Sequence, residues 1–302
     1  MFDAVANGRS VPGDLLGELL DSRSLIDDST ALRERLSRDG YVFLSGALDD
    51  ADVALAREEA FGRLRDVGEI REPASEGITT GESKRRDMVG DLGAFWRSVS
   101  EGAALRKVTH GKRLRHLAEM LLGEPAIGQD FLFLRAAPVG RATGIHCDAP
   151  FFTRMTDRVL TCWLALGPVP VTDGPLFVIE NSHKFDDLVS AMKGFDLMRD
   201  QEGRKATAVD DPIQFVRVRG ARLLTRNFAP GDCLIFGMYT FHGAFDNHSR
   251  INRARLTCDV RYQPASEPLD PRYFGPEPTG TTGAGYGELN GAKPLTEPWH
   301  VR

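Results

Sequence analysis

The chain has 302 residues, of which 41% are hydrophobic and 27% charged, and this composition is typical of a globular protein with a sizeable core. Its net charge of −5 does not favour a nucleic acid or a membrane surface as a partner. The amino-terminal residues lack a basic start followed by an apolar stretch, and no run approaches ~18 consecutive apolar residues, so we expect neither a secretory signal nor a membrane span.

The four cysteines are scattered along the chain and form no CxxC pair. They are Cys147, Cys162, Cys233 and Cys258. A chain of this length with so few cysteines is not a disulfide scaffold. We therefore expect free thiols and a reducing, cytoplasmic location.

Residues 1–125 are predicted to be mostly helical. Asp27, Asp28, Ser29 and Thr30 offer caps for a first helix that Gly40 ends. A short apolar strand over residues 41–44 follows. Next, Asp49 and Asp50 cap a second helix that runs to about Leu64.

The rest of this part contains a polar segment and a third helix. Residues 72–93 are rich in Gly, Ser, Thr and charge, which predicts a mobile loop. That loop is either a lid that closes over a site, carrying Lys84, Arg85 and Arg86, or a surface loop with no part in function. An apolar stripe predicts one helix from about Ala103 to Leu122.

The pattern changes near residue 126. From there to residue 264 the apolar runs are short and separated by Gly, Pro, Asn and Asp, which predicts an antiparallel sandwich or barrel. The clearest strands are predicted at 131–134, 160–164, 233–236 and 253–260, with one helix over 185–198. Residues 265–302 are rich in Gly and Pro, and we expect this tail to wrap the surface. The whole chain, 1–302, is predicted to be one domain with helices packed on a β-core.

His146-Cys147-Asp148 is the first triplet that suggests chemistry. Side chains two residues apart in a strand share a face, so His146 and Asp148 point together while Cys147 points away. One imidazole and one carboxylate are part of the 2-His-1-carboxylate set that binds non-haem iron. Alone, the triplet is equally consistent with a surface pair.

His242 is a candidate for the second imidazole. It ends the segment Gly231–His242, which reads as a turn followed by a single strand, with Phe236, Met238, Thr240 and His242 on one face. The alternative is a hydrogen-bonded histidine in the core.

Arg253 is a candidate for binding a carboxylate. It lies eleven residues after His242 and opens a strand whose polar positions 253, 255, 257 and 259 share one face. A guanidinium matches a carboxylate bidentately. The alternative is a solvated polar face.

Together these residues resemble the phytanoyl-CoA dioxygenase family, which includes the ectoine hydroxylases. The family pattern of HxD, a distal His and an Arg eleven residues later is matched by His146, Asp148, His242 and Arg253. The flanking stretches at 39–53, 160–166, 173–184 and 241–255 are also similar, so the resemblance covers roughly residues 38–264.

The resemblance implies a fold, a cofactor and further site residues. The fold would be mainly β with flanking α-helices, a double-stranded β-helix (jelly roll, cupin-like). His146, Asp148 and His242 would hold Fe(II), and Arg253 would grip the far carboxylate of the co-substrate 2-oxoglutarate. Gln129 and Trp163 would also contact 2-oxoglutarate, and Arg255 is the second choice for the carboxylate because it shares a face with Arg253.

The stretch at His183 differs from the family pattern, and Asp148 distinguishes between the activities of related enzymes. His183 stands where relatives have a Gly-Ser-His stretch, and we interpret it as structural. Asp148 occupies the position that related halogenases fill with a small residue, which disfavours halogenation.

The activity implied is a 2-oxoglutarate-dependent non-haem iron dioxygenase that hydroxylates a C–H bond of a small molecule with O2, releasing succinate and CO2. The same centre could instead catalyse desaturation, cyclisation or epimerisation, and a non-catalytic jelly-roll binding module is the alternative from another class. The basic residues between Arg106 and Arg115 could meet an acyl-CoA phosphate, but we prefer a solvated helix face and a free small-molecule substrate.

Overall fold

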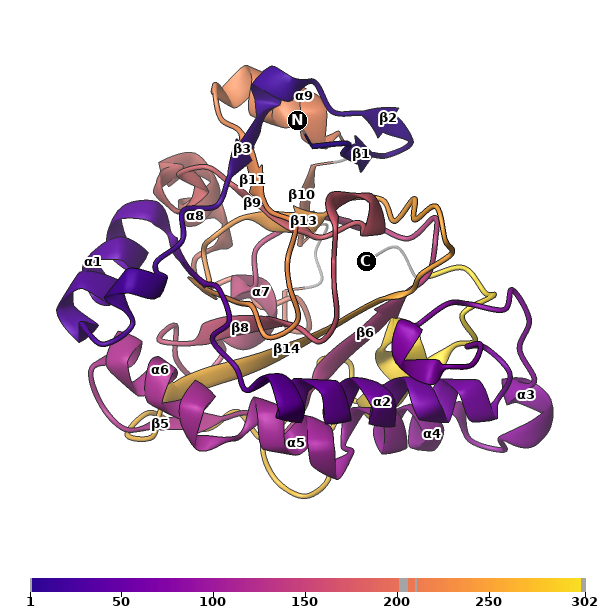
Figure 1. Ribbon diagram of the computed structural model, residues 1–302. Coiled ribbons are helices and arrows are strands. Elements are labelled where there is room, and N and C mark those ends of the chain that lie inside the picture. The colour runs from indigo at the N-terminus through magenta and orange to yellow at the C-terminus, as the bar shows by residue number, and fades with distance from the viewer. Residues whose placement is uncertain (1, 201–205, 210, 300–302) are drawn as a thin grey trace.

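In the computed structural model, which describes residues 2–200, 206–209 and 211–299, two six-stranded sheets form the centre of the molecule (Figure 1). Helices lie against the outer side of one sheet. This arrangement is mainly β with flanking helices and is a jelly roll, as predicted.

The sheet beneath the helices, here the helix-covered sheet, is antiparallel throughout. Its strand order is β4-β12-β8-β14-β5, and β6 also pairs with β14. The strands are β4 (Tyr41–Leu44), β5 (Ala126–Gly128), β6 (Phe133–Ala137), β8 (Leu160–Ala165), β12 (Cys233–Gly237) and β14 (Arg255–Pro264).

The opposing sheet has the order β10-β7-β13-β9-β11-β3. Its strands are β3 (Leu16–Glu18), β7 (Thr143–His146), β9 (Leu176–Ile179), β10 (Thr207–Val209), β11 (Leu223–Thr225) and β13 (His242–Ala244). Near the amino terminus, β1 (Val5–Ala6) and β2 (Arg9–Ser10) form a separate two-stranded ribbon.

The helices α2, α4, α5 and α6 run along the outer face of the helix-covered sheet, and α1 lies beside them (Figure 1). Their bounds are α1 (Ser29–Asp39), α2 (Asp50–Asp66), α4 (Leu92–Ser100), α5 (Ala103–Thr109) and α6 (Lys112–Leu122). The remaining helices are α3 (Arg85–Met88), α7 (Ala149–Phe152), α8 (Asp186–Met192) and α9 (Pro212–Arg219). Within the described residues, no helix combines the length and apolar character that crossing a membrane requires.

The first two helices have the capping residues that the sequence predicted. The Asp28 side chain accepts hydrogen bonds from the backbone N–H groups of Thr30 and Ala31, and Gly40 ends α1 with φ of +79°. Asp49 caps α2 in the same way. Both caps satisfy donors that the first helical turn leaves free.

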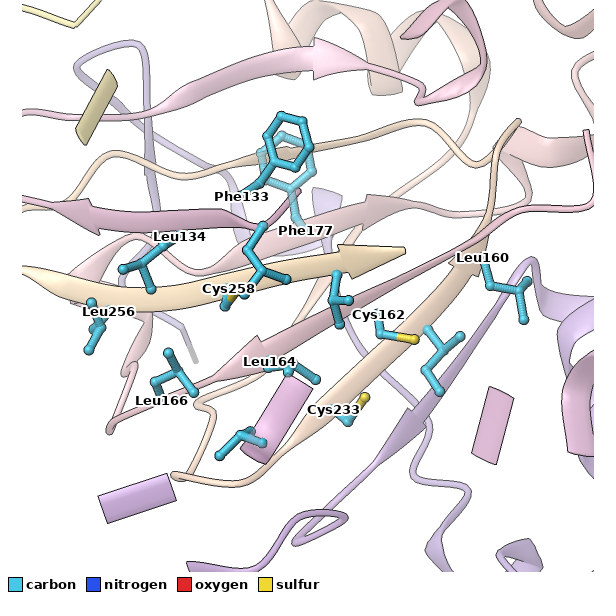
Figure 2. Close-up of a cluster of buried hydrophobic side chains, with 14 of the residues drawn as sticks. Phe133, Leu134, Leu160, Cys162, Leu164, Leu166, Phe177, Cys233, Leu256 and Cys258 are labelled. Carbon is cyan, nitrogen blue, oxygen red and sulfur yellow. The ribbon is translucent and has the colours of Figure 1, made fainter. Parts of the chain in front are cut away.

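Strand alternation divides the buried side chains into two layers. Cys162 and Leu164 of β8, Cys233 of β12 and Leu256 and Cys258 of β14 belong to the apolar core that includes the helices, and Figure 2 shows them gathered there. The intervening residues face the space between the sheets. All four cysteines are buried free thiols.

Five predicted element boundaries were wrong, including that of the strand predicted over 253–260, which is Arg255–Pro264. The helix predicted over 103–122 is two helices, α5 and α6, because the backbone of Gly111 is extended (φ −65°, ψ 160°) and interrupts the helix between them. The strand predicted at 131–134 begins at Phe133, and the helix predicted over 185–198 covers only α8. The single strand predicted to reach His242 ends at Gly237.

The segment 72–93 and the carboxy-terminal tail are bound to each other. Arg85 is fully buried, pairs with buried Glu69, and donates from Nη1 to the carbonyl oxygens of residues 291–293. The tail also contributes buried Tyr273 and Tyr286 to the core. The tail therefore does more than wrap the surface, and Arg85 is not available to a moving lid.

Candidate metal centre

Two neighbouring strands and one turn bring the predicted metal ligands together. His146 ends β7 and His242 begins β13, and the two are directly paired across the antiparallel ladder. Asp148 follows two residues after His146, at the start of α7. One donor atom from each of the three residues lies within 4.8 Å of the others.

Both imidazoles are oriented by backbone carbonyls. His146 Nδ1 lies 2.9 Å from the Gly144 oxygen, and His242 Nδ1 lies 3.0 Å from the Thr240 oxygen. A carbonyl can only accept, so each Nδ1 carries the proton and each Nε2 keeps a free lone pair. These Nε2 atoms lie 3.8 and 4.0 Å from Oδ1 of Asp148.

The site keeps its ligands in the protonation states that metal binding requires. Burial, together with the neighbouring His242, lowers the pKa of His146 to about 3, and burial also lowers the pKa of His242. Burial opposes ionisation of Asp148, but the Arg261 charge, the neighbouring imidazoles and the Thr161 hydrogen bond together hold its pKa below the ordinary value. Two neutral imidazoles and a carboxylate are therefore present at neutral pH.

The second oxygen of Asp148 has its own partners. Oδ2 accepts from the Thr161 hydroxyl and from Nη2 of Arg261, the latter at 2.9 Å. Arg261 is only 3% exposed. Sequence reasoning missed this residue because the predicted strand ended at residue 260, although Arg261 continues the same alternating polar set.

A narrow hollow opens beside the two histidines, between the sheets. Its walls include Trp163 from β8 and Arg255 and Asp259 from β14. Arg135 of β6 also lines it and binds Asp259 through Nε at 3.1 Å. The predicted residue Trp163 therefore lies beside the triad.

The two candidate arginines occupy different surroundings. Arg255 is 1% exposed and lines the hollow, and its Nε and Nη1 have no hydrogen-bond partner in the described structure. Burial lowers the pKa of its guanidinium to about 10. Arg253 does not line the hollow, and its Nη1 binds Asp173 at 3.1 Å.

Gln129 and His183 complete the predicted set. Gln129 is buried, with Oε1 unpartnered, but it does not line the hollow. His183 Nε2 lies 3.2 Å from the Ser37 carbonyl oxygen, away from the triad, as expected for a structural residue.

The donors fit an iron(II) ion and a dicarboxylate. Two imidazoles and one carboxylate on one side leave the opposite positions of an octahedral ion open, as in non-haem iron oxygenases. The buried guanidinium of Arg255 has two donors without partners, and an anion such as the far carboxylate of 2-oxoglutarate would satisfy them.

Comparisons with known proteins agree with this chemistry. The family model for phytanoyl-CoA dioxygenase matches residues 36–255. The 1-deoxypentalenic acid 11-beta-hydroxylase of Streptomyces exfoliatus is 28% identical over 269 residues, covering 84% of this chain and 87% of the relative.

Solved structures give the same result for the fold. The alpha ketoglutarate-dependent epimerase SnoN from nogalamycin biosynthesis is 25% identical with a TM-score of 0.52, covering 82% of this chain and 86% of that one. EctD from S. alaskensis is 18% identical with a TM-score of 0.53, covering 90% of this chain and 91% of that one. Since the family model spans most of the sequence, the chain belongs to the phytanoyl-CoA dioxygenase family and is a 2-oxoglutarate-dependent non-haem iron enzyme.

Proposed function

We propose that the enzyme hydroxylates an unactivated C–H bond of a free small molecule, using His146, Asp148 and His242 as its metal ligands. The observation that carries the proposal is the convergence of these three donor atoms within 4.8 Å beside a hollow with an unsatisfied arginine. The hydroxylase relative, which aligns with most of the chain, supports hydroxylation as the outcome. Iron(II) and 2-oxoglutarate, when bound, supply the oxidising chemistry and release succinate and CO2.

Arg255 is the residue we assign to the far carboxylate of 2-oxoglutarate. The family spacing favours Arg253, but the Arg253 guanidinium lies outside the hollow and is bound to Asp173 through Nη1, with Nε unpartnered, whereas Arg255 lines the hollow and has both Nε and Nη1 without partners. Trp163 and Leu176 close the sides of the same hollow. Their role is to exclude water around the co-substrate, which strengthens the charge pairing there.

A second hollow gives the position we assign to the substrate. It is narrow in the structure and is lined by Phe133, Arg135, Leu289 and Trp299, among others. Arg135 borders both hollows, with Nε held by Asp259. An apolar molecule with one anionic or carbonyl group directed at Arg135 fits this lining.

A coenzyme A ester is not favoured. The basic residues of α5 and α6 lie on the outer side of the helix-covered sheet, whereas the triad lies between the sheets (Figure 1). Lys107 there is paired with Asp52, and Arg106 is paired with Glu101. These pairs leave the solvated helix face as the better interpretation.

The metal ligands are tested by replacing each one. His146→Ala, Asp148→Ala and His242→Ala are each expected to abolish iron binding and succinate formation while the circular dichroism spectrum stays unchanged. A fully active His242→Ala protein would remove that residue from the ligand set. His183→Ala is the matched control, since it changes a histidine that hydrogen-bonds to the Ser37 backbone away from the triad, and it should keep its iron.

The reaction is tested by a panel of small carboxylic acids and ketones, starting with the substrate named for the hydroxylase relative, and by measuring substrate-stimulated succinate release. Hydroxylation predicts a product with one additional oxygen atom derived from O2. Arg135→Met should weaken the response to acids more than to neutral compounds.

Epimerisation is the second candidate, and the likeness to SnoN favours it. An epimerised product has the mass of its substrate and differs only in configuration. Chromatographic separation with mass spectrometry therefore decides between the two reactions in the same assay. Desaturation or ring closure would instead lower the mass by two hydrogen atoms.

We also infer that the enzyme works as one catalytic unit in a reducing, cytoplasmic location. The four cysteines support this location because they are unpaired thiols, and burial raises the pKa of Cys147 and Cys162 to about 12. One continuous apolar core, joining helices, both sheets and tail, supports the single unit.

A further inference from the structure

Arg261 directs its buried guanidinium at one oxygen atom of Asp148. It lies on β14 with its side chain between the sheets, 3% exposed, and among the described residues its guanidinium donates a hydrogen bond to Oδ2 of Asp148. Nε and Nη1 of Arg261 have no hydrogen-bond partner in the described part of the chain. A buried, incompletely paired guanidinium costs stability, so stability does not account for its presence.

The position of this guanidinium is fixed from two sides. Its central carbon lies 3.7 Å from the centre of the Phe152 ring and 4.5 Å from that of Phe133. Phe152 belongs to α7, the short helix that begins directly after Asp148. Arg261 therefore has little freedom to leave the carboxylate, and the Thr161 hydroxyl holds the same oxygen from the neighbouring strand.

We propose that Arg261, assisted by Thr161, is a positioning residue that reserves Oδ2 of Asp148 and leaves only Oδ1 for the metal. This inference rests on the proposed metal ligands. The number of coordination positions limits how the carboxylate can bind the metal. Two imidazoles, one carboxylate oxygen, two oxygens of a chelating ketoacid and one position for O2 make six, which is the full set of an octahedral ion. A carboxylate that bound through both oxygens would remove one of these positions.

The geometry agrees with this division of the two oxygens. Oδ1 is the atom that faces both Nε2 atoms, at 3.8 and 4.0 Å, while Oδ2 is the atom that accepts from Arg261 and Thr161. Partners of this kind, which orient a ligand without touching the metal, typically change metal affinity about 10- to 100-fold when they are removed.

The test is the affinity of the purified protein for Mn²⁺, followed by loss of the electron paramagnetic resonance signal of the free ion. Arg261→Gln is expected to bind Mn²⁺ about 10- to 100-fold more weakly than the unchanged enzyme, and Arg261→Lys to fall between the two. Thr161→Val removes one of the two hydrogen bonds and keeps every charge, so it should show a smaller loss in a protein whose folding is not in question. Arg253→Met is the matched control, because it removes another arginine of the same alternating polar set without touching Asp148 or the hollow beside the histidines, and it should keep its Mn²⁺ affinity within about threefold.

The outcomes separate this inference from the ligand assignment. If Asp148→Ala binds Mn²⁺ as well as the unchanged enzyme, the proposed ligands fail. If Asp148→Ala loses the ion but Thr161→Val and Arg261→Gln bind it normally, only the positioning role fails. Tighter binding by Arg261→Gln would also overturn it, because a residue acting through its charge alone repels the ion, and removing it would raise affinity. Should Arg261→Gln not fold, Arg261→Lys and Thr161→Val decide the question, and normal affinity in both overturns the proposal.

Discussion

The two faces of β14 carry different kinds of buried side chain. The face towards the helices carries Leu256, Cys258 and Val260, all buried among apolar side chains. The face between the sheets carries Arg255 and Arg261, also almost completely buried. Ten consecutive residues of one strand thus form a conventional core on one side and a charged interior on the other.

The difference shows which buried groups serve stability and which serve binding. Apolar side chains gain free energy from burial alone. Charged side chains lose hydration on burial and recover it only through complete pairing. Arg255 differs from Arg85 and Arg261 in having no carboxylate within ion-pair distance among the described residues, so its missing partner is expected to be a ligand.

The largest effect is expected at Arg255. Arg255→Met should raise the dissociation constant for 2-oxoglutarate more than about a hundredfold, since a lost partner of a buried charge typically costs ~3–5 kcal/mol. The free energy of unfolding without ligand should be unchanged or increased, because the guanidinium lacks partners there. Titration of 2-oxoglutarate into the anaerobic iron(II) enzyme, followed by the visible charge-transfer band, measures the first effect, and chemical denaturation measures the second. A weakened fold with normal co-substrate binding would show that Arg255 belongs to the structure and not to the site.

Arg85 sharpens the comparison because it is a buried arginine whose charge has a protein partner. Arg85→Met should lower the free energy of unfolding by about 3–5 kcal/mol, since it leaves the buried carboxylate of Glu69 without its cation. Three carbonyl oxygens of the tail also lose their donor. The measurement is urea denaturation. Arg86→Met is the neighbouring control, because Arg86 is exposed in its pair with Glu297, and it should unfold like the unchanged enzyme. Equal stability of the two variants would contradict the structural role of Arg85.

Leu256 tests the apolar face of β14. Leu256→Ala should lower the free energy of unfolding by about 2–5 kcal/mol through lost burial and the space left behind. Because the side chain points away from the triad, Mn²⁺ affinity of the folded variant should not change. A change in metal affinity at constant stability would mean that the two faces of β14 are coupled.

Local signals let the sequence predict part of this structure. Asp28 and Gly40 mark the ends of α1 by hydrogen bonds and backbone conformation that involve only nearby residues. The strands β4, β8 and β12 were also predicted, since their apolar runs are bounded by polar turns. The metal ligands were predicted because their spacing matches a family pattern.

The rest depends on contacts between distant segments. Apolar and aromatic residues continue through Met238, Tyr239 and Phe241, so nothing local shows that the chain leaves one sheet after Gly237 and joins the other at His242. The charged segment containing Arg85 looks solvated until Glu69 and the tail are placed around it. In the same way, alternation assigns Arg253 and Arg255 to one face and cannot tell which of them finds a carboxylate already in place.

Arg253 is where the smallest effect on co-substrate binding is expected, and it is also the residue that the family spacing singles out. Its guanidinium is bound to Asp173, which is 1% exposed, and it does not line the hollow beside the histidines. Arg253→Met should therefore leave the dissociation constant for 2-oxoglutarate within about threefold, a change of less than ~0.7 kcal/mol. It should lower the free energy of unfolding by about 1–3 kcal/mol, because Asp173 is left buried without its cation. The same charge-transfer titration and denaturation used for Arg255→Met compare the two variants directly.

If Arg253→Met loses more 2-oxoglutarate affinity than Arg255→Met, Arg253 must exchange Asp173 for the co-substrate on binding, and the ion pair is then a resting contact of the ligand-free enzyme. Asp173→Asn separates these cases, since freeing Arg253 from its partner would tighten 2-oxoglutarate binding only if Arg253 is the residue that holds it.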